Sequence, residues 1–125
     1  MKIRILGNSV RLRLSQTEVQ QILQKGQVKQ TVKFGVKTHQ QFHYSLQKAN
    51  IPTIQATYHA NEICVRLPRT MADNWAESDQ ISLETHIPIH DEEQLRILVE
   101  KDFQCIDARQ GEDESDLFPN PAETH

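Results

Sequence analysis

The chain has 125 residues, of which 37% are hydrophobic and 25% are charged, enough for one small domain with a modest core. No apolar run approaches the roughly 20 residues of a membrane span, and the charged start Met1–Gly7 is unlike a signal peptide. Two cysteines are too few for a disulfide scaffold or a four-cysteine zinc site. We therefore expect a bacterial-type cytoplasmic protein with no membrane partner.

The net charge of −3 hides an uneven distribution of charge along the chain. Residues 1–50 carry nine Lys/Arg and one acidic residue, whereas residues 51–125 carry five Lys/Arg and sixteen acidic residues. This distribution fits a local anion-binding face, pairing between the two halves of the chain, or head-to-tail association of copies. Two solvated faces of opposite sign would produce the same pattern.

The first half of the chain predicts two hairpins around one helix. Residues 2–6 and 9–14 form strands around the turn at Gly7-Asn8, since Val10, Leu12 and Leu14 alternate with polar residues. A capping box from Ser15 to Glu18 then begins a helix that ends at Gly26. Period-two alternation returns over residues 27–34 and again over residues 42–46.

The second half predicts the same order of elements. Strands over residues 54–59 and 62–67 flank a turn, and Pro68 begins a short helix with Trp75 on its apolar face. Two further strands follow, at residues 80–87 and from residue 95 onward, around a turn at residues 90–93.

A shift of 53 residues superimposes the two halves without a gap. Leu12 falls on Val65, Val28 on Ile81 and Tyr44 on Ile97. The pattern predicts two ββαββ repeats, residues 1–48 and 54–101, related by a pseudo-two-fold axis. We expect a mostly β (α+β) fold of eight mainly antiparallel strands, in a barrel-like structure with two short helices.

The domain is predicted to span residues 1–107, and residues 108–125 read as an acidic, disordered tail with few apolar side chains. Deleting residues 110–125 should then leave the melting temperature nearly unchanged. Docking of a few residues, such as Phe118, is the alternative.

The opening segment Lys2–Leu14 resembles the swapped-hairpin domains of the AbrB/MazE type, which open with a basic strand, a Gly-Asn-Ser turn and an alternating strand. Val65-Arg66-Leu67-Pro68 resembles the end of that strand. The whole chain also resembles a small bacterial family of unknown function. The AbrB/MazE resemblance implies DNA binding by Lys2, Arg4, Arg11 and Arg13. In the second unit the corresponding residues are Gln55, Thr57, Cys64 and Arg66, so that face has lost most of its charge.

Catalytic and metal-binding patterns are weak. His39 and His43 would lie about 13 Å apart on one strand, too far to share a metal. Cys64 and Cys105 are expected to be structural thiols, and the acidic run at residues 112–116 lacks the spacing of a calcium loop. We therefore assign no catalytic residue, no metal site and no cofactor.

The sequence favours a non-enzymatic binding or regulatory domain. Its basic first hairpin would bind DNA or an acidic protein partner. The candidate binding residues are Lys2, Arg4, Arg11, Arg13 and Arg66. The alternative is a small enzyme with its site in a cleft between the two repeats.

Overall fold

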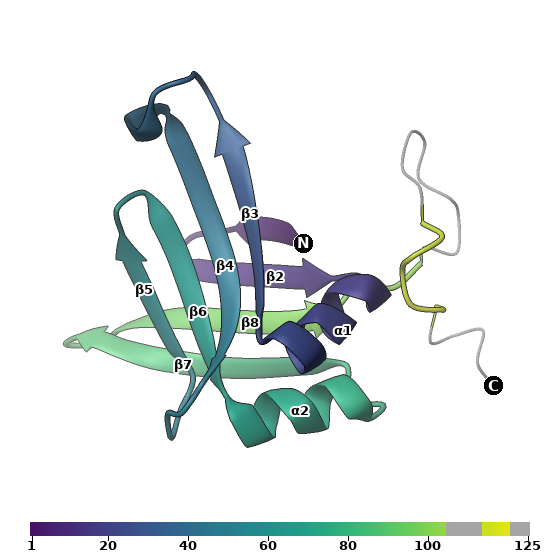
Figure 1. The fold of residues 1–125 in the computed structure, drawn as a ribbon. Coiled ribbons are helices and arrows are strands. Elements are labelled where there is room, and N and C mark those ends of the chain that lie inside the picture. The colour runs from purple at the N-terminus through teal and green to yellow at the C-terminus, as the bar shows by residue number, and fades with distance from the viewer. Residues whose placement is uncertain (105–113, 121–125) are drawn as a thin grey trace.

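The computed structural model describes residues 1–104 and 114–120, and the elements follow the order ββαββ twice (Figure 1). The first half comprises β1 (Lys2–Ile5), β2 (Ser9–Leu14), α1 (Gln16–Lys25), β3 (Gln27–Lys33), the short 3₁₀ helix η1 (Thr38–Gln40) and β4 (Gln41–Ala49). The second half comprises β5 (Gln55–His59), β6 (Glu62–Pro68), α2 (Arg69–Glu77), β7 (Ser82–His90) and β8 (Glu93–Lys101).

Local signals in the sequence account for the ends of these elements. Ser15 and Glu18 form the predicted capping box of α1, and Gly26 ends that helix in the left-handed conformation with φ 78°. Gly7 also has positive φ, at the predicted turn between β1 and β2. The predicted capping box of the first helix, its end at Gly26 and the turn at Gly7 are therefore confirmed.

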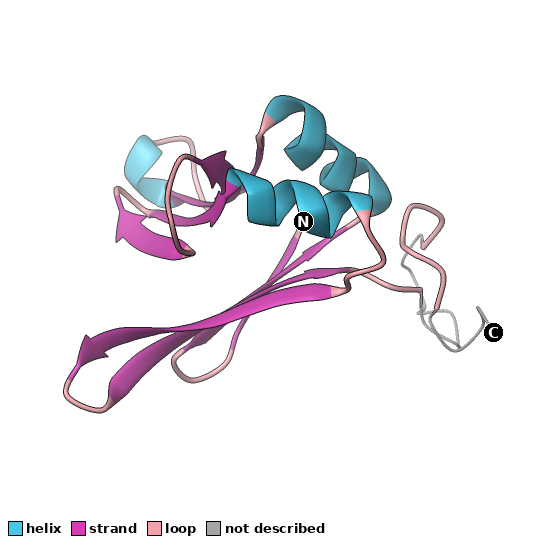
Figure 2. Ribbon diagram, turned by 90° about the horizontal axis from the view of Figure 1, so that it is seen from below, coloured by secondary structure: helices cyan, strands magenta, loops and turns pink. Residues whose placement is uncertain are grey.

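The eight strands form two separate four-stranded sheets. Sheet A has the order β1-β2-β8-β7 and sheet B the order β3-β4-β6-β5. In each sheet the central pair is parallel, β2 with β8 and β4 with β6, and the outer pairs are antiparallel. Figure 2 shows the long strands of sheet A as a layer distinct from the strands of sheet B. Helices α1 and α2 lie on the same side of sheet A as sheet B does.

The expected barrel-like arrangement of mainly antiparallel strands is wrong. The described strands form two mixed sheets and no closed barrel, because each helix sends the hairpin that follows it to the other sheet. Each sheet therefore takes one hairpin from each half of the chain, and the two inner strands run in the same direction. An alternating strand has the same hydrophobic pattern beside a parallel or an antiparallel neighbour, so the pattern could not distinguish them.

The 53-residue shift holds for three of the four strand pairs. Ser9 of β2 pairs with Arg96 of β8. The residues that correspond to them in the other half, Glu62 of β6 and His43 of β4, also pair. The shift fails for β3 and β7. Val28 pairs with Leu46, and the corresponding residue Val99 pairs with Leu83, not with Ile81. The connection after α2 is longer than the single Gly26 after α1, so the ungapped alignment is wrong by two residues there.

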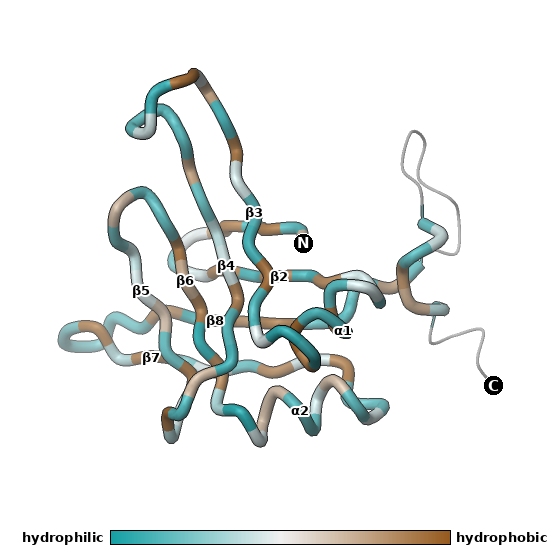
Figure 3. The backbone as a smooth tube through the Cα atoms, in the orientation of Figure 1, coloured by the Kyte–Doolittle hydropathy of each residue, from teal (hydrophilic) through white to brown (hydrophobic). Residues whose placement is uncertain are grey.

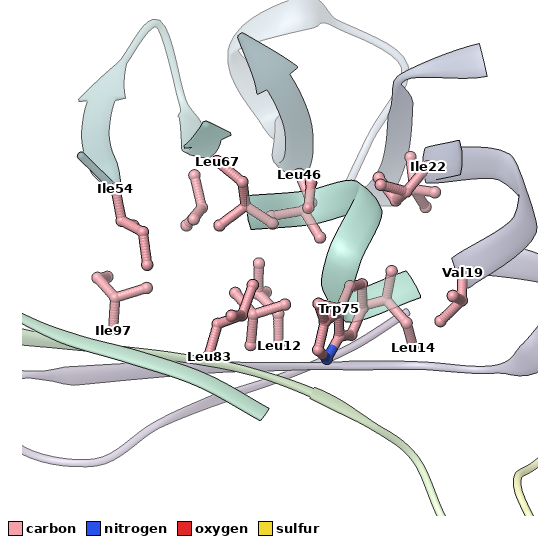
Figure 4. Close-up of a cluster of buried hydrophobic side chains, with 14 of the residues drawn as sticks. Leu12, Leu14, Val19, Ile22, Leu46, Ile54, Leu67, Trp75, Leu83 and Ile97 are labelled. Atoms are coloured by element: carbon pink, nitrogen blue, oxygen red, sulfur yellow. The ribbon is translucent and has the colours of Figure 1, made fainter. Parts of the chain in front are cut away.

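The core lies between the two sheets and beneath the helices. Leu12 and Leu83 of sheet A face Leu46 and Leu67 of sheet B, and Trp75 of α2 is fully buried beside them (Figure 4). Trp75 Nε1 donates a hydrogen bond to the carbonyl of Ile81 at 3.0 Å, so the only tryptophan is buried with its polar atom satisfied. Figure 3 shows apolar and polar residues alternating along the central strands.

Residues 114–120 pack against the body beside α1. The Asp116 carbonyl accepts from the backbone N–H of Gln16, and its carboxylate accepts from the Thr17 hydroxyl at 3.0 Å. The Phe118 ring lies 5.8 Å from that of Phe103, and Leu117 is buried. These contacts match the docked alternative that the sequence leaves open for Phe118. The rest of the acidic segment, residues 108–113 and 121–125, lies outside the described residues.

No helix in the described part of the chain combines the length and the apolar character needed to cross a membrane.

Candidate binding face

Basic side chains gather on the outer face of sheet A, the face turned away from the core. Buried Val10, Leu12 and Leu14 point inward from β2, so Arg11 and Arg13 point outward. Register places Arg4 opposite Arg11 and Lys2 opposite Arg13, and it places Arg96 of β8 beside Ser9. We call this set the basic face: Lys2, Arg4, Arg11, Arg13 and Arg96.

Acidic side chains from the second half neutralise part of the basic face. Arg13 Nε donates to Glu100 Oε1 at 2.9 Å, and Arg11 Nε lies 2.7 Å from the same oxygen. Arg11 Nε is buried and makes no hydrogen bond, so its contact with Glu100 is an ion pair without aligned geometry. Lys2 Nζ lies 3.0 Å from Asp102, which is 5% exposed.

The charge asymmetry of the sequence therefore reflects, in part, pairing between the two halves of the chain. Besides the pairs on the basic face, Lys29 pairs with Glu62 at 3.2 Å and Lys48 with Asp73 at 2.8 Å. Each of these pairs joins a basic residue of the first half to an acidic residue of the second half. Intramolecular pairing was one of the interpretations that the charge distribution left open.

Three guanidinium-bearing side chains line a small hollow on the basic face. Arg4, Arg11 and Arg96 come from β1, β2 and β8 and surround a depression of about 110 Å³, together with Leu6, Ser9 and Leu98. No described residue forms an ion pair or hydrogen bond with the Arg4 side chain, which is exposed. The hollow is thus lined by apolar side chains and three guanidinium groups. Arg11 and Arg96 are partly neutralised by glutamates, and Arg4 is neutralised by no described residue.

Arg96 is held by an exposed ion pair on the same face. Its Nε donates to Glu84 Oε1 at 2.8 Å. This hydrogen bond lowers the pKa of the Glu84 carboxyl and raises the pKa of the Arg96 guanidinium. Both groups are therefore charged throughout the neutral range.

The structure brings together four of the five predicted binding residues. Arg66 lies on β6 in sheet B, where it pairs in register with Gln47 and Gln55, so it is not part of the basic face. Arg96 was missed by the sequence analysis. The alternation of Leu95, Ile97 and Val99 predicts that Arg96 faces outward. The alternation does not predict that β8 lies parallel to β2, and that pairing places Arg96 on the basic face.

The outer face of sheet B carries a buried serine that is hydrogen-bonded to a partly exposed glutamate. Ser45 is fully buried, and its hydroxyl donates to Glu62 Oε2 at 2.6 Å. This hydrogen bond, aided by Lys29, lowers the pKa of Glu62. A carboxylate paired in this way is a poor general base, so the pair stabilises the sheet and is not arranged for nucleophilic catalysis.

The cysteines and histidines do not form a reactive cluster in the described part of the chain. Cys64 is a free, buried thiol opposite Ser45 in the sheet, and Cys105 lies outside the described residues. His43 Nδ1 lies 2.8 Å from the Thr31 hydroxyl, and His90 lies beside Asp91 at an exposed turn. No group of three metal-ligating side chains occurs in residues 1–104 and 114–120.

A hollow lies between the end of α2 and the residues Phe118 and Pro119. Its lining includes Phe103, Phe118 and the buried Lys101, whose Nζ donates to the Ser78 carbonyl at 2.6 Å. The same ammonium lies 5.9 Å from the Trp75 ring centre and 5.6 Å from that of Phe118. Burial lowers the pKa of Lys101, but these contacts tie the amine to the end of α2 and to the rings.

No curated protein and no solved structure matches this chain. A family model, described as a family of unknown function (DUF7009), matches residues 1–122, nearly the whole chain. This match agrees with the expected small family of unknown function, and it gives no support to the AbrB/MazE resemblance. The chain belongs to the DUF7009 family of unknown function.

Proposed function

We propose that the chain is a binding module that holds an acidic segment of a partner protein on its basic face. One observation carries this proposal: Arg4, Arg11 and Arg96 surround one hollow that also exposes apolar side chains. Guanidinium groups bind carboxylates through paired hydrogen bonds, and they do so best where neighbouring apolar groups exclude water. Arg4 supplies a cation that no described residue neutralises.

Mixed charge favours an acidic protein over duplex DNA as the partner. Glu84 and Glu100 lie on the same face as the arginines and would repel a regular row of phosphates. A protein segment can place its carboxylates on Arg4 and Arg96 and its apolar side chains on Leu6 and Leu98. Alternating acidic and apolar residues are therefore the expected pattern in the partner.

The test is a binding titration with a short labelled peptide of alternating Glu and Leu. We expect a Kd of about 10–100 µM at about 50 mM salt, since the contact is small and exposed. Arg4→Glu should weaken binding by about tenfold or more, because it replaces this cation with a repelling charge. Arg69→Glu makes the same charge change at the start of α2 and should leave the affinity nearly unchanged.

Duplex DNA provides the competing outcome. If the basic face binds phosphates instead, DNA will bind more tightly than the peptide, with a slope of log affinity against log salt near about −3. That result, or the absence of peptide binding at about 50 mM salt, would overturn the proposal.

A further inference from the structure

Two long hairpins end in tips of opposite charge. Lys33 ends β3 and Lys37 lies in the connection to β4, and no acidic residue occurs from residue 27 to residue 41. Asp91 and Glu92 connect β7 to β8 and Glu93 begins β8, and no Lys or Arg occurs from residue 82 to residue 95. We call residues 33–39 the basic tip and residues 89–93 the acidic tip.

Both tips also expose large apolar side chains. Phe34 is 77% exposed and Val36 is 96% exposed on the basic tip, and Ile89 is 57% exposed on the acidic tip. Exposure of apolar side chains to water is unfavourable, and a group of such side chains on a protruding hairpin is typical of contact surfaces. The basic and the acidic tip therefore share apolar character and differ in charge.

A depression that an apolar side chain could enter lies beside the basic tip, between it and the turn that joins β5 to β6. Phe34, Phe42 and Tyr58 line this depression with His39, Gln40 and Asn61, and Tyr58 is itself 70% exposed. Ile89 on the acidic tip is a branched apolar residue, and three acidic residues follow it within four positions of the sequence. Entry of Ile89 into the hollow would bring those carboxylates toward Lys33 and Lys37.

The described part of one chain offers almost no counter-charge to either tip. Lys33, Lys37, Glu92 and Glu93 form no ion pair within the described residues, and Asp91 contacts only the neighbouring His90, at 3.3 Å. The two hairpins point in different directions: in Figure 1 the β3–β4 hairpin ends at the top and the β7–β8 hairpin ends at the left. Within the described residues, both tips are therefore open to contact with another molecule.

We propose that the chain associates head to tail with a second copy, the basic tip of one copy contacting the acidic tip of the next. The contact joins two different surfaces, so it closes if two copies exchange tips reciprocally and otherwise extends into a chain of copies. Each contact is small, so we expect association with a Kd of about 10–100 µM. This inference does not depend on the basic face.

Sedimentation velocity of the full chain, from about 1 to about 500 µM, tests the proposal. We expect wild-type protein to associate as concentration rises, and to do so less at high salt. The double variants Lys33→Glu/Lys37→Glu and Glu92→Lys/Glu93→Lys should each remain monomeric, because each then carries two tips of like charge. An equimolar mixture of the two variants should associate again, since the charges are complementary once more.

Control variants separate the tip contact from general charge effects. Lys25→Glu/Arg69→Glu makes the same charge change at the helices, away from both tips, and should associate like wild type. Phe34→Ser and Ile89→Ser keep the charges and should each weaken association by about tenfold or more. Circular dichroism should show every variant folded, since all the substituted residues are exposed.

Two outcomes would overturn the proposal. One is a wild-type chain that stays monomeric to about 500 µM; the other is a charge-swapped mixture that fails to associate although both variants are folded. A monomeric chain that sediments with anionic vesicles through Phe34 would instead assign the basic tip to a lipid surface.

Discussion

Ser45 is the residue at which the outer face of sheet B departs from an ordinary solvated surface. It is buried, and its hydroxyl donates to Glu62, which Lys29 also contacts. The sequence shows only a Ser among alternating polar residues and gives no sign of this burial. The pair forms because β4 and β6 are parallel neighbours, a long-range pairing that period-two alternation does not specify.

Ser45→Ala should reduce stability most at neutral pH. The hydrogen bond from Ser45 lowers the pKa of Glu62, so its stabilising effect is present above the ordinary value of 4.5 and is lost as the pH falls through the lowered pKa. We expect a cost of about 1–2 kcal/mol at pH 7, discounted for the partial exposure of Glu62, and a smaller cost near pH 3.

Urea unfolding at several pH values measures this difference, and NMR titration of Glu62 should show its pKa rising in the variant. Thr57→Ala, an exposed change on the neighbouring strand β5, is the control and should cost little at any pH. A cost that does not depend on pH would contradict the link between Ser45 and the Glu62 charge.

Leu12 and Val65 occupy matching positions in the two halves and are both fully buried. Leu12→Ala and Val65→Ala should each lower the free energy of unfolding by about 2–4 kcal/mol, because each opens a cavity in the shared core. Val36→Ala, on a 96% exposed side chain, should cost less than about 0.5 kcal/mol. Chemical denaturation measures all three, and a small cost at either core site would contradict the packing between the sheets.

The N-terminus of helix α1 receives hydrogen bonds from two parts of the chain. Ser15 caps it locally, and Asp116 adds a carbonyl and a carboxylate from nearly a hundred residues away. The local cap was predictable because a capping box lies within four residues of sequence. The distant one was not, since the composition around Asp116 is that of a disordered tail and only docking on the body reveals its partners.

Phe118→Ala should lower the free energy of unfolding by about 1–2 kcal/mol, because the ring packs on Phe103 and over the Lys101 ammonium. Deletion from residue 114 onward should lower the melting temperature by about 5 °C or more, contrary to the expectation from composition alone. Pro119→Ala, at the exposed neighbouring position, is the matched control. Thermal unfolding followed by circular dichroism gives the result, and an unchanged melting temperature on deletion would show that these contacts contribute no stability.

The positions of the helices and strands could be predicted from the sequence more fully than the pairing between strands. The turns at Gly7 and Gly26 and the burial of Leu12 and Val65 follow from local geometry and period-two patterning. Parallel pairing of β2 with β8 joins residues nearly ninety positions apart, and nothing in either strand encodes the direction of its neighbour. For the same reason the candidate site was found only in part: Arg4 and Arg11 share a hairpin, whereas Arg96 reaches them only through that pairing.

Glu100 connects the stability of the whole molecule to the charge of the basic face. It lies at 2.7 Å from Arg11 and 2.9 Å from Arg13, and it is 14% exposed. Glu100→Gln removes the carboxylate that Arg11 and Arg13 share while keeping an oxygen that can accept from Arg13. We expect the free energy of unfolding to fall by about 1 kcal/mol, because two neighbouring guanidinium groups lose their shared counter-charge.

The same substitution should strengthen binding of the acidic peptide several-fold and steepen its salt dependence, since the freed arginines then add to the field of Arg4. Peptide titration and urea unfolding of the same Glu100→Gln preparation measure the two effects together. Glu77→Gln, an equal charge change at the end of α2, should alter neither. Weaker stability with unchanged peptide affinity would mean that Glu100 only holds β2 against β8. Tighter binding at the expense of stability would instead mean that an acidic partner competes with Glu100 for the same two arginines.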